Sequence, residues 1–237
     1  MTPADGARRS PIYLQVAERI REAIIAGHLR PGDALPTERE LSESLGVSRA
    51  SVREALRALQ AQGLVAASGP PARTVVVPGA GDHARDALVT LMRLKGVGVA
   101  DLMSFRALLE GEAVAMAAGR HDDPWLDEAD AALTDMRHPD LSVAEFDEAD
   151  LRFHLALVRA SGNEAMQLVM QALRGAVALH LATHLESQDD LPATLARLTA
   201  EHEAILRAVR GGDGAAARTL IRSHIEAFYS DAPDSTC

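Results

Sequence analysis

Apolar residues recur at helical spacing near the start of the chain. Residues 11–26 carry an apolar side chain at every fourth position from Ile12 to Ile24, and the run ends at Gly27. This spacing places the apolar side chains on one side of a helix, and a glycine commonly follows the last helical turn. The pattern therefore predicts a first helix over residues 11–26.

Two shorter helices are predicted after a turn-rich stretch. Thr37 and Glu40 fit a capping box, and the helix that they open ends near Gly46. Ser48 can cap the next helix, which is predicted over residues 49–62. Two short helices joined by a tight turn that contains glycine are typical of a helix-turn-helix.

The second of these helices has two distinct faces. Its apolar side chains share one face: Val52, Leu56 and Leu59. Arg49, Arg53 and Arg57 share another face that contains no acidic residue. Arginine reads guanine bidentately or binds phosphate, so this face suits the major groove of DNA. A solvated charged face has the same spacing, and the spacing alone leaves both interpretations open.

A β-hairpin is predicted after the third helix. Residues 64–67 and 74–77 are rich in valine and alanine and are separated by a tip, 68–73, that contains glycine and proline. A helix, a helix-turn-helix and then a hairpin are the order of a winged helix domain.

The motifs of this region resemble the DNA-binding domain of the GntR family. The resemblance rests on Leu35-Pro-Thr-Glu-Arg-Glu-Leu41, Leu45-Gly-Val-Ser-Arg49 and Val52-Arg-Glu-Ala-Leu56, and it covers nearly all of residues 10–77. It implies that the matching arginines contact DNA, that Ser48 touches the backbone and that Gly69 is the wing glycine. The candidate DNA-binding residues are Thr37, Arg39, Ser48, Arg49, Arg53, Arg57 and Gly69.

The wing departs from the family pattern. Two prolines, Pro70 and Pro71, stand where the tip usually has a basic or polar residue and a second glycine. This departure puts minor-groove contacts by the wing in doubt, and Arg73 is the candidate to replace them.

The rest of the chain shows helix signals and no strand pattern. Asp123-Pro124 is a helix start, and Ser142 with Glu145 is a second capping box. Seven helices are predicted, over residues 84–94, 99–119, 124–137, 142–160, 164–184, 192–210 and 213–230. We expect a mainly α protein, with the winged helix followed by a linker over residues 78–83 and an all-α bundle over 84–231.

Four polar residues of the bundle form a candidate metal site. Asp150 and His154 are four residues apart on one helix, while His202 and His224 lie on two later helices. Imidazole nitrogens and a carboxylate suit a first-row divalent metal. Scattered histidines also occur in protein cores without any metal, so the residues alone leave this site open.

The contexts of these residues resemble the FCD domain, the effector domain of FadR-type GntR regulators. The stretches Phe146-Asp-Glu-Ala-Asp-Leu-Arg-Phe-His154 and Glu201-His-Glu-Ala-Ile205 carry the resemblance, together with Phe105-Arg-Ala-Leu-Leu-Glu110. It implies that Asp150, His154, His202 and His224 hold a divalent metal, with zinc favoured and nickel or manganese as alternatives. It also implies an effector-binding role for Arg106.

Two alternatives accompany these assignments. Arg106 could instead form a structural salt bridge with Glu110, four residues further on. His180 and His184 form a rival pair at metal-ligand spacing, although partly exposed helix positions explain them as well.

Charge separates the two parts of the chain. The net charge is −10, but residues 1–80 hold 10 arginines against 8 acidic residues. Residues 81–237 hold 14 basic residues against 26 acidic ones. This asymmetry suggests a DNA-binding head followed by an acidic domain with a different task.

Composition indicates a cytoplasmic protein. We find no run of about 18 apolar residues that would cross a membrane, and no signal peptide over residues 1–10. The single cysteine, Cys237, cannot form an internal disulfide, so a reducing compartment is expected.

We therefore expect a homodimeric transcription regulator, in the first place a repressor. A small carboxylate effector would bind at or near the metal and alter the affinity for operator DNA. A metal-dependent hydrolase is the main rival, but no separate general base stands beside the four ligands. An architectural DNA-binding protein would leave the large acidic domain unexplained.

Overall fold

The computed structural model describes residues 10–69, 73–77, 81–120, 122–138, 140–186 and 188–229. The chain divides into two compact units, residues 1–83 and 84–237. The first unit contains α1 (Ile12–Ile25), α2 (Glu38–Leu45), α3 (Arg49–Ala61), β1 (Val65–Ser68) and β2 (Arg73–Val76). This order confirms the predicted winged helix-turn-helix.

The predicted capping interactions stabilise the helix-turn-helix. The Thr37 side chain accepts a hydrogen bond from the Glu40 backbone N–H, and the Glu40 carboxylate accepts one from the Thr37 backbone N–H. Gly46 closes α2 with a φ of +64°, a left-handed conformation that favours glycine. The Ser48 side chain then caps α3 at the Ser51 backbone N–H. Both caps satisfy N–H groups that a helix start otherwise leaves without a partner.

The apolar face of α3 forms the centre of the first unit's core. Val52, Leu56 and Leu59 are buried as predicted. They belong to one hydrophobic cluster with Val16 and Ile20 of α1 and with both strands of the wing. Helix α3 is therefore fixed in place by its packing against α1 and against the hairpin.

The wing is an antiparallel hairpin in which Val65 pairs with Val76 and Ser68 pairs with Arg73. Both strands are shifted by one residue from the predicted ranges, towards the tip of the hairpin. Residues 70–72 lie outside the described residues. The segment before α2 adds a short bridge between Ala34 and Val75, so β2 is paired along both edges.

The second unit is all-α. Its helices are α4 (Gly81–Lys95), α5 (Val99–Ala117), α6 (Pro124–Met136), α7 (Val143–Ala160), α8 (Glu164–Glu186), α9 (Leu191–Arg210) and α10 (Gly214–Tyr229). Each predicted helix is found, with ends within three residues of the prediction. The largest difference is in α4, which already includes residues 81–83 of the predicted linker. A glycine in a first turn does not stop a helix, because the N–H groups there have no partner within the helix in any case.

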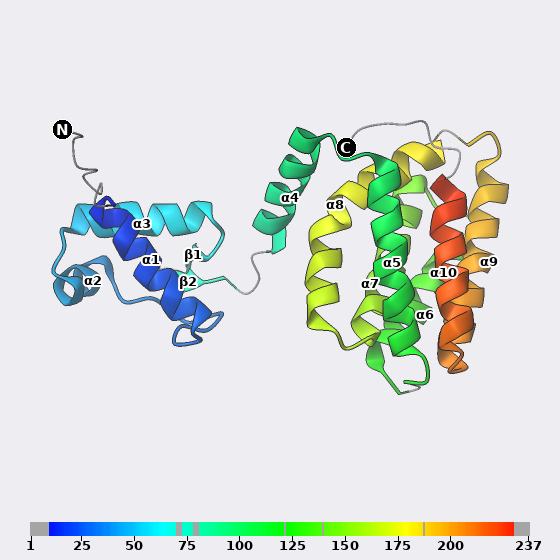
Figure 1. Ribbon diagram of the computed structural model, residues 1–237, viewed down its shortest axis with the longest axis horizontal. Helices are drawn as coiled ribbons and strands as arrows, with labels where there is room; N and C mark the ends of the chain where they lie inside the picture. The colour runs from blue at the N-terminus through cyan, green and yellow to red at the C-terminus, as the bar shows by residue number, and fades with distance from the viewer. Residues whose placement is uncertain are drawn as a thin grey trace, which may run out of the picture. The chain divides into compact units, whose positions relative to one another are not determined.

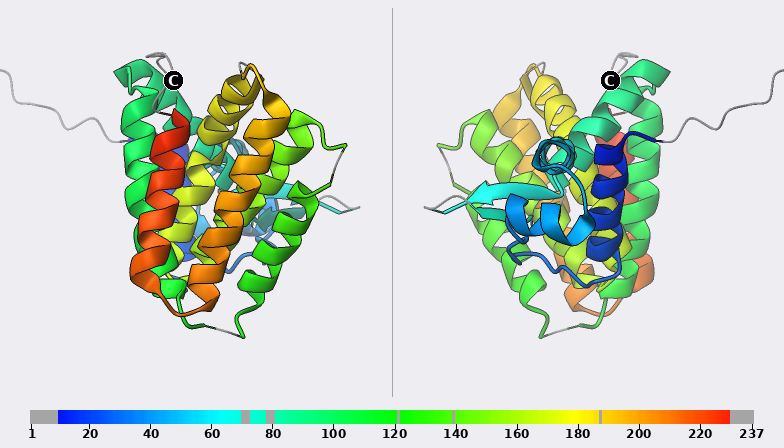
Figure 2. Two further views of the ribbon diagram at one scale, coloured as in Figure 1. Left: turned by 90° about the vertical axis from the view of Figure 1, so that its right-hand side faces the viewer. Right: turned by 90° about the vertical axis from the view of Figure 1, so that its left-hand side faces the viewer.

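Helices α5 to α10 pack around one core. Figure 1 shows α5 between α8 and α10, with α6 and α7 behind them. Figure 2 shows α9 beside α10 on one side and α6 on the other, in agreement with the contacts between these helices. Phe146, Phe153 and Leu198 are among the buried side chains of the core. Within the described residues, we find no helix long and apolar enough to cross a membrane.

Candidate metal centre and DNA-binding helix

The four predicted metal ligands meet inside the bundle. Asp150 and His154 come from successive turns of α7, His202 comes from α9 and His224 comes from α10. All four side chains are buried, and His154 and His202 have no exposed surface. Their convergence follows from the packing of three helices that are distant in sequence.

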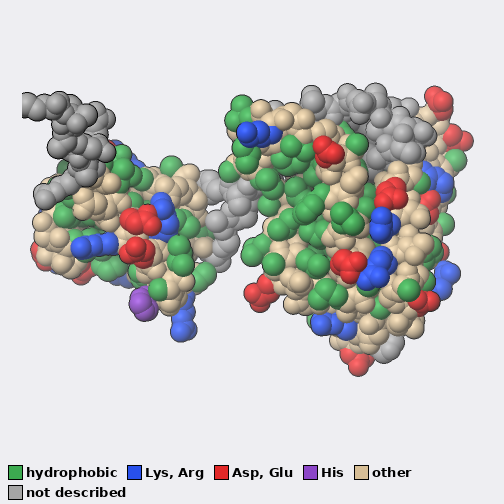
Figure 3. Space-filling view, in the orientation of Figure 1, with side chains coloured by type: hydrophobic (Ala, Val, Ile, Leu, Met, Phe, Trp, Pro, Cys, Tyr) green, Lys and Arg blue, Asp and Glu red, His purple; other side chains and the backbone are tan. Residues whose placement is uncertain are grey.

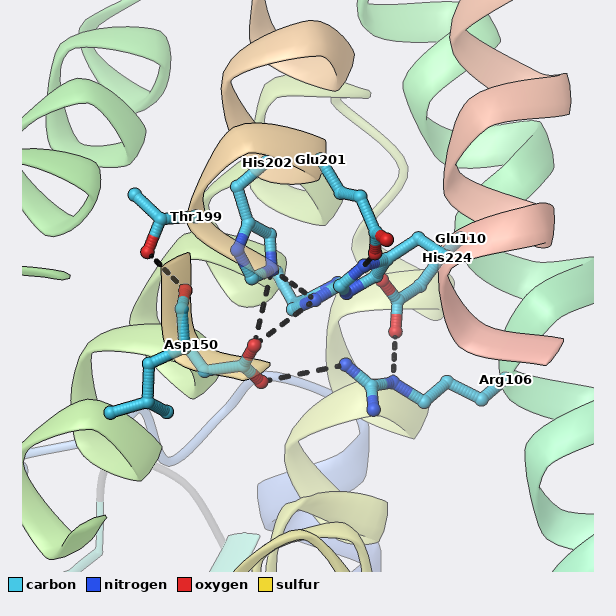
Figure 4. Close-up of polar contacts among 9 residues, drawn as sticks. Arg106, Glu110, Asp150, Thr199, Glu201, His202 and His224 are labelled. Atoms are coloured by element: carbon cyan, nitrogen blue, oxygen red, sulfur yellow. Dashed lines mark hydrogen bonds and ion pairs between the residues drawn. The ribbon is translucent and has the colours of Figure 1, made fainter. Parts of the chain in front are cut away.

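The ligating atoms lie at distances that fit a single ion. His202 Nε2 is 3.1 Å from Asp150 Oδ1 and 3.2 Å from His154 Nε2. His154 Nε2 is 3.7 Å from Asp150 Oδ1. One ligand atom from each of the four residues lies within 4.8 Å of the others (Figure 4). Ligands that each lie about 2 Å from one ion are about 3–4 Å apart, so this donor set can hold a divalent metal.

Two further carboxylates orient the imidazole rings. Glu110 of α5 hydrogen-bonds His154 at Nδ1, and Glu201 of α9 lies 2.7 Å from His224 Nδ1. A carboxylate that accepts a hydrogen bond from Nδ1–H keeps the proton on that nitrogen, which leaves the Nε2 lone pair for a metal. His202 Nδ1 is buried and has no hydrogen-bond partner among the described residues.

The charges around the centre favour metal-binding protonation states. Burial, together with the nearby His224, lowers the pKa of His202 to about 3 against the opposing effect of Asp150, so His202 is neutral. Burial alone raises the pKa of Asp150, but His154 and His202 outweigh burial and hold it well below its usual range. A neutral imidazole and an ionised carboxylate are the forms that bind a metal.

Arg106 lies at the edge of this centre. Its Nε is 2.6 Å from Glu110 Oε1, and its Nη2 is 3.9 Å from Asp150 Oδ2. Burial raises the pKa of Glu110, but the opposing effects of Arg106 and His154 lower it to about 2. The salt bridge that we set against an effector role is thus present, and it places Arg106 beside a predicted metal ligand.

A small cavity adjoins the centre. It is lined by Arg106, Asp150, Leu181, Leu198, His224, Ile225 and Phe228. Its volume is about 10 Å³, which is about the space of one water molecule. An organic acid therefore needs a rearrangement of this lining before it can enter.

The arginine face of α3 is exposed. Arg49, Arg53 and Arg57 all point away from the core. The arginine face of α3 contains no acidic residue of α3 itself, as the sequence predicts. However, the carboxylate of Glu38, on α2, lies 3.1 Å from the guanidinium of Arg53. An exposed pair of this kind is weak and screened by salt, so a phosphate or base can replace the glutamate.

The other predicted DNA contacts also lie on the first unit. Arg39 is exposed and is paired with Glu43 at 3.1 Å. The Thr37 and Ser48 hydroxyls serve as helix caps at the two helix starts. Gly69 directly follows β1 with a φ of +73°, a conformation that favours glycine, and Arg73 is exposed at the start of β2.

Sequence reasoning missed the orienting carboxylates. Glu110 was considered only as a partner of Arg106, and Glu201 was not assigned a role. The available signal was the repeated spacing of an arginine four residues before each glutamate, in Arg106-Ala-Leu-Leu-Glu110 and Arg197-Leu-Thr-Ala-Glu201. The rival pair His180 and His184 lies on α8, but both side chains are outside the described part of the chain.

Comparisons with known proteins agree with both units. Residues 12–69 match the bacterial regulatory proteins of the gntR family, and residues 101–227 match the FCD domain. The chain belongs to the GntR family of regulators with an FCD domain. As a GntR-family protein it is a DNA-binding transcription regulator and not an enzyme, since the matching families and relatives are regulators.

Two curated relatives and one solved structure span most of this GntR-family chain. It is 33% identical to the HTH-type transcriptional regulator LutR of Bacillus subtilis over 211 residues, which cover 84% of this chain and 91% of LutR. It is 30% identical to the Glc operon transcriptional activator of Escherichia coli over 233 residues, which cover 95% of this chain and 91% of the activator. The structure of Streptococcus agalactiae GntR matches with a TM-score of 0.69 at 23% identity and covers 93% of this chain and 100% of that one, which shows the shared fold.

We predict about one divalent ion per chain in the purified protein, and a lower melting temperature after chelation, because an ion that binds only the folded state stabilises it. The double variant His202→Ala, His224→Ala should lose the ion, as measured by elemental analysis. His138→Ala, at an exposed position before α7, is the matched control and should keep it. If the double variant keeps its full metal content, the site lies elsewhere in the protein.

Proposed function

We propose that this regulator binds a small organic acid at or beside a divalent metal held by Asp150, His154, His202 and His224. Binding of the acid alters the affinity for operator DNA. The observation that carries this proposal is the buried cluster of one carboxylate and three imidazoles, which lies against the guanidinium of Arg106. Zinc is the favoured ion, and nickel and manganese suit the same donors.

Charge balance supports an anionic effector. Among the buried side chains of the centre, the carboxylates of Glu110 and Asp150 outnumber the guanidinium of Arg106, and without a metal they leave one negative charge. A divalent ion changes this to one buried positive charge, since metal-bound imidazoles are neutral. Uncompensated buried charge is costly, so the metal-loaded site favours a ligand with one carboxylate. The metal supplies positive charge to that carboxylate, and Arg106 is placed to bind it bidentately.

The small volume of the cavity supports a link between binding of the acid and the conformation of the bundle. Its lining comes from α5, α7, α8, α9 and α10, and its volume of about 10 Å³ is too small for an acid of several heavy atoms. Entry of the acid therefore moves side chains or helices of the bundle. A ligand shifts a conformational equilibrium only by its differential affinity for the two states, and this expansion provides such a difference.

A homodimer would place two DNA-binding heads on one operator. A single helix-turn-helix contacts few bases, and dimers read two half-sites. The described exposed apolar residues of α5 and α8 offer a surface for the second copy: Phe105, Leu108, Met116, Leu168 and Val169. Figure 3 shows apolar side chains gathered over these two helices. We propose that this surface, the α5–α8 face, is the dimer interface.

We propose repression, relieved by the acid, as the direction of control. The Glc operon relative is named an activator, so a reporter gene behind the operator decides the direction: deletion of the regulator should raise expression of a repressed gene. A fall in expression after deletion would assign activation instead.

Arg49→Ala and Arg53→Ala are each expected to weaken operator binding by about 1–3 kcal/mol, if the lost contact is to a base. Neither side chain is part of the core, so both variants should fold. A mobility-shift titration measures the change. Arg19→Ala, which removes the same charge from an exposed position on α1, should retain discrimination between operator and random DNA. Unchanged operator binding by both α3 variants would show that another element reads the DNA.

We expect one member of a panel of L-lactate, pyruvate and succinate to change operator affinity several-fold. The effect should disappear in Asp150→Ala, because the metal is lost. Arg106→Ala should weaken binding of the acid while the metal content stays the same. Calorimetry and operator titration on each variant test these statements. An acid that still acts on the metal-free variant would place the sensing site elsewhere.

Leu108→Glu or Leu168→Glu is expected to shift the protein from dimer to monomer and to weaken operator binding. A charge buried in an apolar interface without a partner is strongly unfavourable. Analytical ultracentrifugation measures the shift. Leu220→Glu, at a partly exposed leucine of α10, is the control and should leave the dimer intact. Dissociation of the control variant alone would move the interface to α10.

A further inference from the structure

The bundle contains two arginine–glutamate pairs of the same design. Arg106 and Glu110 are four residues apart on α5, and Arg197 and Glu201 are four residues apart on α9. Side chains at this spacing lie next to each other on a helix. In both pairs an arginine nitrogen is 2.6 Å from a glutamate Oε1, and the other oxygen of each glutamate, Oε2, contacts a histidine Nδ1.

The pair on α5 is buried and the pair on α9 reaches solvent. The Arg106 and Glu110 side chains are 3% and 0% exposed, whereas those of Arg197 and Glu201 are 47% and 31% exposed. Water competes for hydrogen bonds at the second pair but not at the first. The charges of the buried pair therefore interact in a medium of low dielectric constant, where interactions between charges are strongest. A change in the position of one partner consequently has a strong effect on the other.

The buried pair also closes a ring around the metal centre. Glu110 joins His154 to Arg106, Arg106 Nη2 lies 3.9 Å from Asp150 Oδ2, and Asp150 Oδ1 lies 3.7 Å from His154 Nε2. Figure 4 shows Arg106 pointing to both carboxylates. The second pair forms no such ring, because Arg197 extends from α9 towards solvent.

We propose that Glu110 is a positioning residue that couples the metal to Arg106. Its Oε2 contacts His154 Nδ1 and leaves His154 Nε2 facing Asp150 and His202, where a metal would bind, and its Oε1 fixes the guanidinium that would receive the acid. Occupation of the metal site therefore sets the position and hydrogen bonding of Arg106. Glu201 orients His224 in the same way but transmits nothing to Arg106. This inference rests on the proposed function, because it assumes that the metal binds at His154 and the acid at Arg106.

The first test uses zinc alone with full-length protein and the variants Glu110→Gln and Glu201→Gln. Both substitutions keep the side-chain size and remove the carboxylate. Zinc affinity, measured by competition with a chromophoric chelator, should fall by about ten- to hundredfold in each variant, the usual effect of losing a carboxylate that orients a metal-bound histidine. Circular dichroism of the metal-free proteins controls for folding. Wild-type zinc affinity in folded Glu110→Gln would overturn the positioning role.

If Glu110→Gln fails to fold, Glu110→Asp provides the second variant. Its shorter side chain keeps the buried charge but cannot reach both Arg106 and His154 from the same backbone position. The same loss of zinc affinity is expected, and full affinity in this variant would overturn the proposal.

The second test measures the coupling. The Arg106 Nε–H is buried and hydrogen-bonded, so its nuclear magnetic resonance signal reports on the guanidinium. Saturating zinc should shift this signal in the wild type and in Glu201→Gln. In Glu110→Gln, or in Glu110→Asp, the shift should be at least halved. A full shift in the Glu110 variant would assign the coupling to Asp150 and overturn the role of Glu110.

The outcomes separate this inference from the proposed function. Absence of zinc binding in the wild type would remove the metal site and everything built on it. Zinc binding with no change in the Glu110 variant would leave the metal site in place and remove only the coupling. A failure of every acid in the panel would concern the effector alone, because both tests use zinc.

Discussion

The bundle is organised around two buried carboxylates, Glu110 and Asp150. Transfer of an ionised carboxylate from water to a protein interior costs several kcal/mol unless partners replace the lost hydration. Here Arg106 lies between the two carboxylates, and histidines contact each of them on the other side. These groups come from α5, α7 and α9, so the same compensation that keeps the charges buried also fixes the relative positions of the helices.

In the first unit, the ion pairs of the DNA-binding helices are exposed to water instead of buried. Arg53 and Glu38 form their ion pair with side chains that are 56% and 39% exposed, and Arg39 and Glu43 are similarly open to water. Such pairs contribute little to stability and weaken with salt. These weak pairs do not hold the arginine side chains in one position. DNA phosphates can therefore replace the glutamates at a small cost in free energy. One chain thus combines a buried charge network at the proposed metal site with exposed, exchangeable ion pairs on the DNA-binding unit.

The parts of this fold that could be predicted are those with a signal within one short stretch of the sequence. Thr37 with Glu40, and Ser142 with Glu145, mark helix starts through bonds to their own backbone, and both boxes are present. The apolar face of α3 followed from spacing within one helix. Contacts between helices carried no such signal: nothing near Glu38 in the sequence indicates Arg53, and nothing near Glu110 indicates His154. The metal cluster was the exception, because a family resemblance linked four residues on three helices.

The charge of the metal-loaded centre also bears on the choice among acids within the proposed function. Arg106 and a divalent ion exceed Glu110 and Asp150 by one positive charge, and a single carboxylate brings the buried centre to neutrality. A dicarboxylate would leave one buried negative charge without a partner in the cavity lining, which is otherwise aliphatic or aromatic apart from His224. Since an unpaired buried charge costs more than an extra methylene gains, the proposed effector is a monocarboxylic acid rather than a dicarboxylic one. A hydroxyl or keto oxygen beside the carboxylate would add a second ligand for the ion without adding charge.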